Sequence, residues 1–216
     1  MVPVIGHAVS VRGHTDDGLL SGLLTGHGGP MTSVVSVRRI YEGWLNLLIV
    51  RLRAVSGDEM DRHVVELGRA VCVLPYDPER RTALIVSMPR APVTLLGLPD
   101  MLEAIAGGLD SNNPEECARR EAMEEAGVRL DVLDHVGRIW PMPSNATKQI
   151  DYYLAEYHLA DRVGAGGGLA HEQENITVHE LGLRELWEMH ARNSLGDGKL
   201  VTLLLSLRDR QPALFT

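Results

Sequence analysis

Apolar residues follow two different spacings along this chain, and each spacing predicts one kind of secondary structure. Runs that alternate with polar residues, or that are rich in β-branched side chains, predict strands within residues 34–66, 69–88, 128–140, 149–160 and 176–181. Apolar residues three and four positions apart predict helices at residues 113–127, 182–193 and 199–210. Strands mixed with three helices indicate a layered α/β or α+β domain.

Turn residues divide two of these stretches into paired strands. The turn "SGDEM" within residues 34–66 predicts a hairpin or a small antiparallel sheet, and the polar turn Asp77-Pro78-Glu79-Arg80 predicts a second hairpin within residues 69–88. Proline and glycine punctuate residues 89–99, which we expect to form a loop. The predicted organisation is a disordered leader or upstream extension at 1–30, a small sheet at 31–67, the main domain at 68–210 and a tail at 211–216.

The clearest helix signals surround residues 113–127, "NPEECARREAMEEAG". Asn113 is a favoured N-cap, and Pro114 suits the first helical position because no N–H is needed there. Glu116 is placed to complete a capping box, and Gly127 is typical of a left-handed C-cap.

This helix carries three like charges on one face. At about 100° per residue, Glu121, Glu124 and Glu125 fall within roughly a third of the circumference, opposite a face of alanine and methionine. Two interpretations fit this spacing. The face is either solvated and balanced by nearby arginines, or it binds a divalent cation, because Mg²⁺ and Mn²⁺ prefer carboxylate oxygens.

Composition limits the class of protein. A chain of 216 residues, 44% hydrophobic and 23% charged, is typical of a globular protein with one sizeable core. Its formal charge of −8 argues against a nucleic-acid partner. We expect Cys72 and Cys117 to be buried free thiols in a reducing compartment, and no apolar run has the length of a membrane span. These features predict a cytoplasmic protein.

The stretch "AGGLDSNNPEECARREAMEEAGV" resembles the signature of the Nudix hydrolases. Residues 120–128 match the Arg-Glu-apolar-x-Glu-Glu-x-Gly-apolar part at every fixed position. The glutamate expected eight residues before Arg120 is Asn112, and the shortened loop is similar to that of the nucleoside-diphosphate-sugar branch, which includes GDP-mannose and ADP-ribose pyrophosphatases. The residues around it, from roughly 62 to 208, resemble the same branch.

The resemblance implies a fold and an activity. The expected fold is the Nudix α/β/α sandwich with a mixed sheet, preceded by a small antiparallel sheet through which such proteins usually form homodimers. The expected activity is hydrolysis of the pyrophosphate bond of a nucleoside diphosphate sugar, with Mg²⁺ or Mn²⁺. Alternatives are hydrolysis of dinucleotides such as NADH or Ap₄A or of nucleoside triphosphates, and a module that binds such ligands without catalysis.

The resemblance also assigns roles to residues. Glu121, Glu124 and Glu125, with the backbone carbonyl of Ala106, would hold the metal, and Glu125 would belong to the catalytic group. The general base would be Glu172, our first choice, or Glu174. The structural positions of the motif are Gly107, Arg120 and Gly127, and the substrate-binding candidates are Arg90 and Glu103.

Two positions outside the motif stay open. Arg90 either contacts a substrate phosphate or simply caps a turn or pairs with Glu103. Relatives in this branch often carry a glutamate where this chain has Lys148 and Gln149, and the difference bears on which substrate is preferred.

Overall fold

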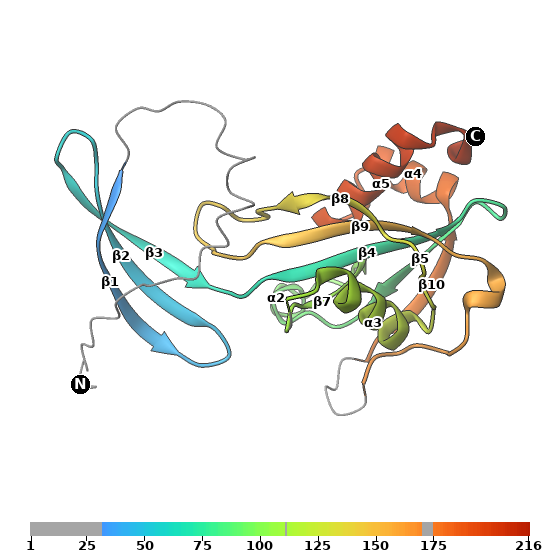
Figure 1. Cartoon of the computed structure of the whole chain (residues 1–216), viewed down its shortest axis with the longest axis horizontal. Coiled ribbons are helices and arrows are strands. Elements are labelled where there is room, and N and C mark those ends of the chain that lie inside the picture. Colours follow the sequence, from blue (N-terminus) through green and yellow to red (C-terminus); the bar gives the residue numbers. More distant parts are fainter. Residues whose placement is uncertain (1–31, 111, 170–174) are drawn as a thin grey trace. The chain divides into compact units, whose positions relative to one another are not determined.

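The computed structural model describes residues 32–110, 112–169 and 175–216, so the predicted leader at 1–30 lies outside the described residues. The described chain divides into two compact units (Figure 1). The first contains the residues up to Leu67 together with Met142–Thr147, and the second contains Gly68–Pro141 and Lys148–Thr216. Within the described part of the chain, no helix is long and apolar enough to cross a membrane.

The first unit is built on a three-stranded antiparallel sheet. Its strands, in the order β1-β2-β3, are β1 (Ser33–Glu42), β2 (Asn46–Arg53) and β3 (Glu59–Glu66). Opposite charges face each other across β2 and β3, where Arg51 is in register with Asp61 and Arg53 with Glu59. The predicted small antiparallel sheet is therefore confirmed.

The second unit contains a seven-stranded mixed sheet. Its path is β10-β5-β4-β9-β8, with β6 paired to β5 and β7 to β4. The bounds are β4 (Ala70–Asp77), β5 (Thr82–Ser87), β6 (Leu102–Glu103), β7 (Ile105–Gly108), β8 (Asp134–Ile139), β9 (Ile150–Glu156) and β10 (Thr177–Gly182). Strands β4 and β9 are parallel, and the other pairs are antiparallel.

The predicted hairpin of residues 69–88 opens soon after its turn. Strands β4 and β5 pair only at Tyr76↔Ala83 and Asp77↔Thr82. Further along, β7 takes the place of β5 beside β4, and β6 lies beside β5. This splayed hairpin draws residues 102–108 into the sheet, and the segment carries several of the candidate site residues.

Helices cover both faces of this sheet (Figure 1). Helix α3 (Pro114–Ala126) packs through Cys117, Ala118 and Ala122 on one face. Helices α4 (Leu183–Ala191) and α5 (Gly198–Arg210) cover the other, with four α5 leucines in the core. The predicted α/β/α sandwich with a mixed sheet is confirmed.

Two predictions of local structure were inaccurate. The predicted loop at 89–99 contains a short helix, α2 (Ala91–Leu95). Proline in the first turn of a helix costs no hydrogen bond and already has a helical φ, so it did not exclude one. The strand predicted within 128–140 begins only at Asp134. Two short 3-10 turns complete the fold, at Leu159–Asp161 and Pro212–Phe215, and the second buries Phe215 in the core.

Candidate active site

The ends of α3 are formed by the predicted caps. The Oδ1 atom of Asn113 accepts a hydrogen bond from the backbone N–H of Glu116 at 3.3 Å, and Pro114 is the first helical residue. Gly127 ends the helix in a left-handed conformation with φ 64°. Both caps are confirmed, and they fix the length and phase of the helix that carries the acidic face.

The three carboxylates of α3 lie on a partly closed face. Glu125 is 3% exposed, and the side chains of Glu121 and Glu124 are 14% and 27% exposed. Arg120 contacts two of them, because its Nη2 donates to Glu121 Oε1 at 3.0 Å and its Nε lies 3.9 Å from Glu124 Oε2. Its Nη1 also donates to Asp110 at 3.2 Å. One guanidinium thus faces several negative charges that water screens incompletely.

Gly107 forms a floor beneath Glu121. A Cβ atom at Gly107 would lie 2.0 Å from Glu121 Cδ and 2.3 Å from both carboxylate oxygens. No L side chain fits there unless the Glu121 carboxylate moves. The neighbouring Gly108 has open space around its Cα. The glycine at 107 is therefore required by the position of the acidic side chain.

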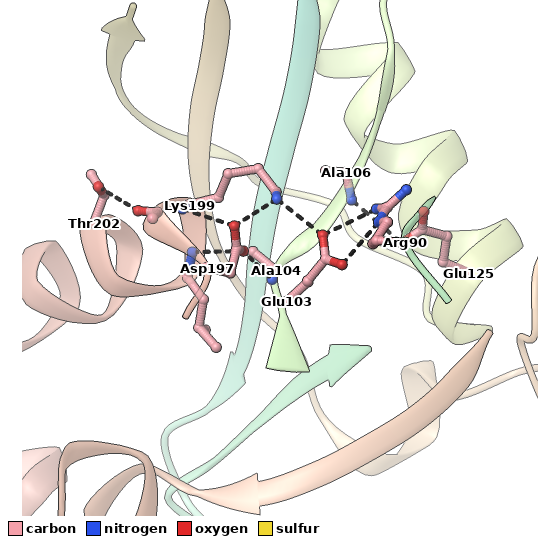
Figure 2. Close-up of polar contacts among 10 residues, drawn as sticks. Arg90, Glu103, Ala104, Ala106, Glu125, Asp197, Lys199 and Thr202 are labelled. Carbon is pink, nitrogen blue, oxygen red and sulfur yellow. Dashed lines mark hydrogen bonds and ion pairs between the residues drawn. The ribbon is translucent and has the colours of Figure 1, made fainter. Parts of the chain in front are cut away.

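Ala106 and Glu125 meet at the same edge. The backbone N–H of Ala106 on β7 donates to Glu125 Oε2 at 3.3 Å. Strand β7 and helix α3 are thus joined where both predicted ligands lie (Figure 2). The predicted ligand at Ala106 is the backbone carbonyl, and that role stays a prediction.

The donor set suits a hard divalent cation. All three side-chain donors are carboxylate oxygens from two adjacent helical turns, the ligand type that Mg²⁺ and Mn²⁺ take. Within residues 32–110, 112–169 and 175–216, no three His, Cys, Asp or Glu side chains converge closely enough to hold a metal ion. In this arrangement Glu121 contacts Arg120 and Glu125 contacts Ala106, so a cation would replace these contacts in part.

A glycine-rich loop closes the carboxyl end of α3. The backbone N–H of Gly167 donates to the Glu125 carbonyl at 2.9 Å, and that of Gly168 donates to the Glu124 carbonyl at 3.0 Å. Gly166 has φ 70°, and a Cβ there would lie 2.3 Å from the Glu125 carbonyl oxygen. The loop therefore caps the backbone of two of the acidic residues. The sequence analysis missed this contact, although the run of glycines at 164–168 was its signal.

The predicted general bases follow this loop. Glu172 and Glu174 lie outside the described residues, so their catalytic role stays a prediction.

A chain of alternating charges lies beside the acidic helix (Figure 2). Arg90 donates to Glu103 through Nε at 2.8 Å and Nη2 at 3.1 Å. The Nζ of Lys199 donates to Glu103 Oε2 at 3.2 Å and to Asp197 Oδ1 at 2.7 Å. Asp197 is also the N-cap of α5 and accepts from the backbone N–H of Ala104. We call these four side chains, Arg90, Glu103, Lys199 and Asp197, the ion chain.

Burial and charge act against each other in the ion chain. Burial alone would raise the pKa of Glu103, but the hydrogen bond from Arg90 and the charges of Lys199 and Arg90 hold it below its ordinary value. Burial alone would lower the pKa of Lys199, but Asp197 and Glu103 hold it above its ordinary value. The opposite charges therefore stabilise each other in a site with little access to water.

The structure brings Arg90 and Glu103 together, which is the pairing that we had left open. Contact of either residue with substrate stays a prediction. The sequence analysis missed Asp197 and Lys199, whose signal was the Asp-Gly-Lys start of a helix, typical of an N-cap. Residues 102–108 join the two groups, since Glu103 lies at one end and Ala106 and Gly107 at the other. Three residues of extended chain span at most about 10 Å, so the ion chain and the acidic face are neighbours.

Comparison with known proteins shows the same relationship throughout the main domain. The family model described as "NUDIX domain" matches residues 66–201. The chain is 35% identical over 151 residues to a GDP-mannose pyrophosphatase of Cronobacter sakazakii, covering 69% of this chain and 78% of that protein. It is 37% identical over 145 residues to a GDP-mannose pyrophosphatase of Yersinia enterocolitica, covering 66% and 75%.

The fold has a counterpart among solved structures. The crystal structure of an ADP compounds hydrolase superposes with a TM-score of 0.70 and 14% sequence identity, covering 87% of this chain and 98% of the other. The family model, the relatives and the acidic helix over a glycine floor agree. The chain belongs to the Nudix family.

Proposed function

We propose that this protein hydrolyses the pyrophosphate bond of a nucleoside diphosphate sugar and releases a nucleoside monophosphate and a sugar phosphate. GDP-mannose is the first candidate substrate, and ADP-ribose is the second through the resemblance of the signature. The observation that carries the proposal is the acidic face of α3 above Gly107, in a chain 34–37% identical to several GDP-mannose pyrophosphatases.

Nudix hydrolases generally need a divalent metal, and in this chain Glu121, Glu124, Glu125 and the Ala106 carbonyl would hold it. A bound Mg²⁺ or Mn²⁺ neutralises phosphate oxygens and lowers the pKa of water. The protein's own part is to fix the donors. Arg120 orients Glu121, Gly107 leaves room for the Glu121 carboxylate, and Gly127 with the glycine-rich loop ends the helix at Glu125.

The proton of the attacking water would pass to Glu172 or Glu174, with Glu172 as our first choice. This assignment rests on the resemblance and on the glycine-rich loop, which leads from α3 toward these residues in the sequence. Arg90 and Glu103 would lie on the substrate side. The Arg90 guanidinium is 39% exposed as a side chain, so a phosphate can reach it while Glu103 holds its orientation.

We further propose a cytoplasmic homodimer that pairs through the first unit. Its three-stranded sheet exposes apolar side chains that a partner copy would cover, including Trp44 at 95% and Tyr41 at 57%. Light scattering of the purified chain and of Trp44→Ser would test this part.

The first experiment measures turnover. GDP-mannose, ADP-ribose, NADH, Ap₄A and a nucleoside triphosphate are each incubated with the protein and Mg²⁺ or Mn²⁺, and the released monoesters are quantified through a phosphatase-coupled phosphate assay. Glu125→Gln is compared with Glu115→Gln, which makes the same change on the same helix at an exposed ion pair with Arg119. We expect Glu125→Gln to lose at least about a hundredfold in activity, because even residues that only support metal ligands cost ten- to a hundredfold.

The outcomes separate the alternatives. Turnover of a nucleotide sugar that is lost in Glu125→Gln and kept in Glu115→Gln supports the proposal. Preference for NADH, Ap₄A or a triphosphate moves the substrate class. Binding of GDP-mannose or ADP-ribose without turnover by the wild type favours a non-catalytic binding module and contradicts the proposal.

A further inference from the structure

Lysine is rare in this chain, and its two occurrences lie in the same region. The sequence contains 21 lysine and arginine residues, of which only Lys148 and Lys199 are lysines. Lys199 belongs to the ion chain (Figure 2). An ammonium is a compact charge that binds single oxygens, whereas arginine favours planar paired contacts. The two lysines therefore mark the place where this arginine-rich chain uses the smaller cation.

The backbone places Lys148 on the side of the sheet that α5 covers. Pairing with β4 extends two residues beyond the end of β9, because the backbone N–H of Ala70 donates to the carbonyl of Gln149 at 2.9 Å. Ile150 and Tyr152 belong to the core cluster beneath α5. Alternate residues of an extended chain share a face, so Lys148 precedes them on the side from which Lys199 enters the ion chain.

The charges around Lys148 are positive. Burial lowers the pKa of Lys148, and the charges of Lys199 and Arg90 lower it further. Among the described residues, no carboxylate forms an ion pair with Lys148, whereas the ion chain already balances Arg90 and Lys199 against Glu103 and Asp197. Lys148 therefore adds an unbalanced positive charge to a half-buried site in a chain whose formal charge is −8.

We propose that Lys148 is a specificity-determining residue that binds an anionic oxygen of the substrate beside Lys199 and Arg90. The proposal rests on the proposed function and deepens it by naming the chemistry of the ligand. The anionic oxygen belongs either to the diphosphate, which all nucleotide sugars share, or to a carboxylate on the sugar, as in a nucleotide uronate. In both cases the bound anion offsets a positive charge whose burial is unfavourable in the free protein.

The rarity of lysine makes a direct test possible. Reductive methylation with ¹³C-formaldehyde gives one dimethylamine NMR signal each for Lys148 and Lys199, besides that of the amino terminus, and Lys148→Arg assigns them. Three probes are titrated: inorganic pyrophosphate, UDP-glucose and UDP-glucuronate. We expect at least one of them to displace the Lys148 signal and to raise the pH at which it titrates. Response to pyrophosphate assigns the diphosphate, and response to UDP-glucuronate alone assigns the sugar carboxylate.

Kinetics of Lys148→Met provides the second readout, since methionine keeps the apolar stem and removes the charge. We expect kcat/KM for the substrate whose anion Lys148 binds to fall about ten- to a hundredfold, mainly through KM, as for loss of a charged hydrogen bond. Lys148→Arg should restore part of it, and Lys148→Glu should be worse than methionine. Arg184→Met, at a side chain that is 74% exposed, is the matched control.

Two results would overturn the inference. A Lys148 signal that no probe displaces excludes contact with an anion, and an unchanged KM in Lys148→Met and Lys148→Glu excludes a role in specificity. Failure of the proposed function is recognised separately, as absence of wild-type turnover, because the NMR titration does not depend on hydrolysis.

Discussion

Two groups of carboxylates lie at the two ends of residues 102–108, and the protein neutralises them to very different degrees. In the ion chain, Glu103 and Asp197 each have a cationic partner within 3.2 Å, and the group balances to zero charge. On the acidic face of α3, Glu121, Glu124 and Glu125 share contacts with Arg120. Carboxylates that the protein neutralises itself hold the fold together, whereas carboxylates left in excess are available to a cation from solution.

The largest expected effect would break the ion chain. Lys199→Met leaves Glu103 and Asp197 buried without their shared cation, and removing one partner of a buried ion pair costs about 3–5 kcal/mol. Urea denaturation should show a loss of this size in the free energy of unfolding. Lys148→Met is the control, because Lys148 pairs with none of the described carboxylates, and it should unfold at the same urea concentration as the wild type or a higher one. An equal loss in both variants would contradict the distinction.

The second effect concerns the acidic face and an added metal. Mg²⁺ or Mn²⁺ at a hundred times its dissociation constant should stabilise the fold by about 2.7 kcal/mol, because the ion binds the folded chain only. Glu121→Gln should abolish this gain. In metal-free buffer the same variant should be as stable as the wild type, since removing a like charge relieves a small repulsion. Thermal unfolding with and without EDTA measures both, and a gain that survives in Glu121→Gln would place the metal elsewhere.

A third change tests how residues 102–108 serve the acidic face. Gly107→Ala introduces a methyl group where the Glu121 carboxylate lies, so Glu121 must move. A displacement of about 1 Å at a catalytic group can cost about a hundredfold in rate, and overpacking costs about 1–3 kcal/mol. Gly108→Ala is the neighbouring control, because its Cβ meets nothing within 4 Å. Equal activity of the two variants would show that the position of Glu121 is not critical.

Prediction from sequence succeeded for local features and stopped where the chain folds back on itself. The caps of α3 and its acidic face follow from residue type and helical spacing, so Asn113, Gly127 and the three glutamates were found. The ion chain joins Arg90, Glu103 and Lys199, which are 13 and 96 residues apart in pairs, and no local pattern reports such a contact. The splayed hairpin was missed for the same reason, because the pairing of β7 with β4 depends on a distant segment.

The smallest effect separates burial from geometry. Arg51 and Asp61 in the first unit form a paired contact at 2.8 Å and 3.1 Å, the same distances as Arg90 and Glu103. The Asp61 side chain is 42% exposed and that of Glu103 is 4% exposed. Water screens the exposed pair and solvates whichever partner remains, so Asp61→Asn should leave the free energy of unfolding unchanged within error, whereas Glu103→Gln should lower it clearly. Urea denaturation of both variants makes the comparison. Equal losses would mean that contact geometry decides the contribution of an ion pair in this protein. The expected difference would mean that burial decides it, and that the ion chain is structural because water cannot reach Glu103.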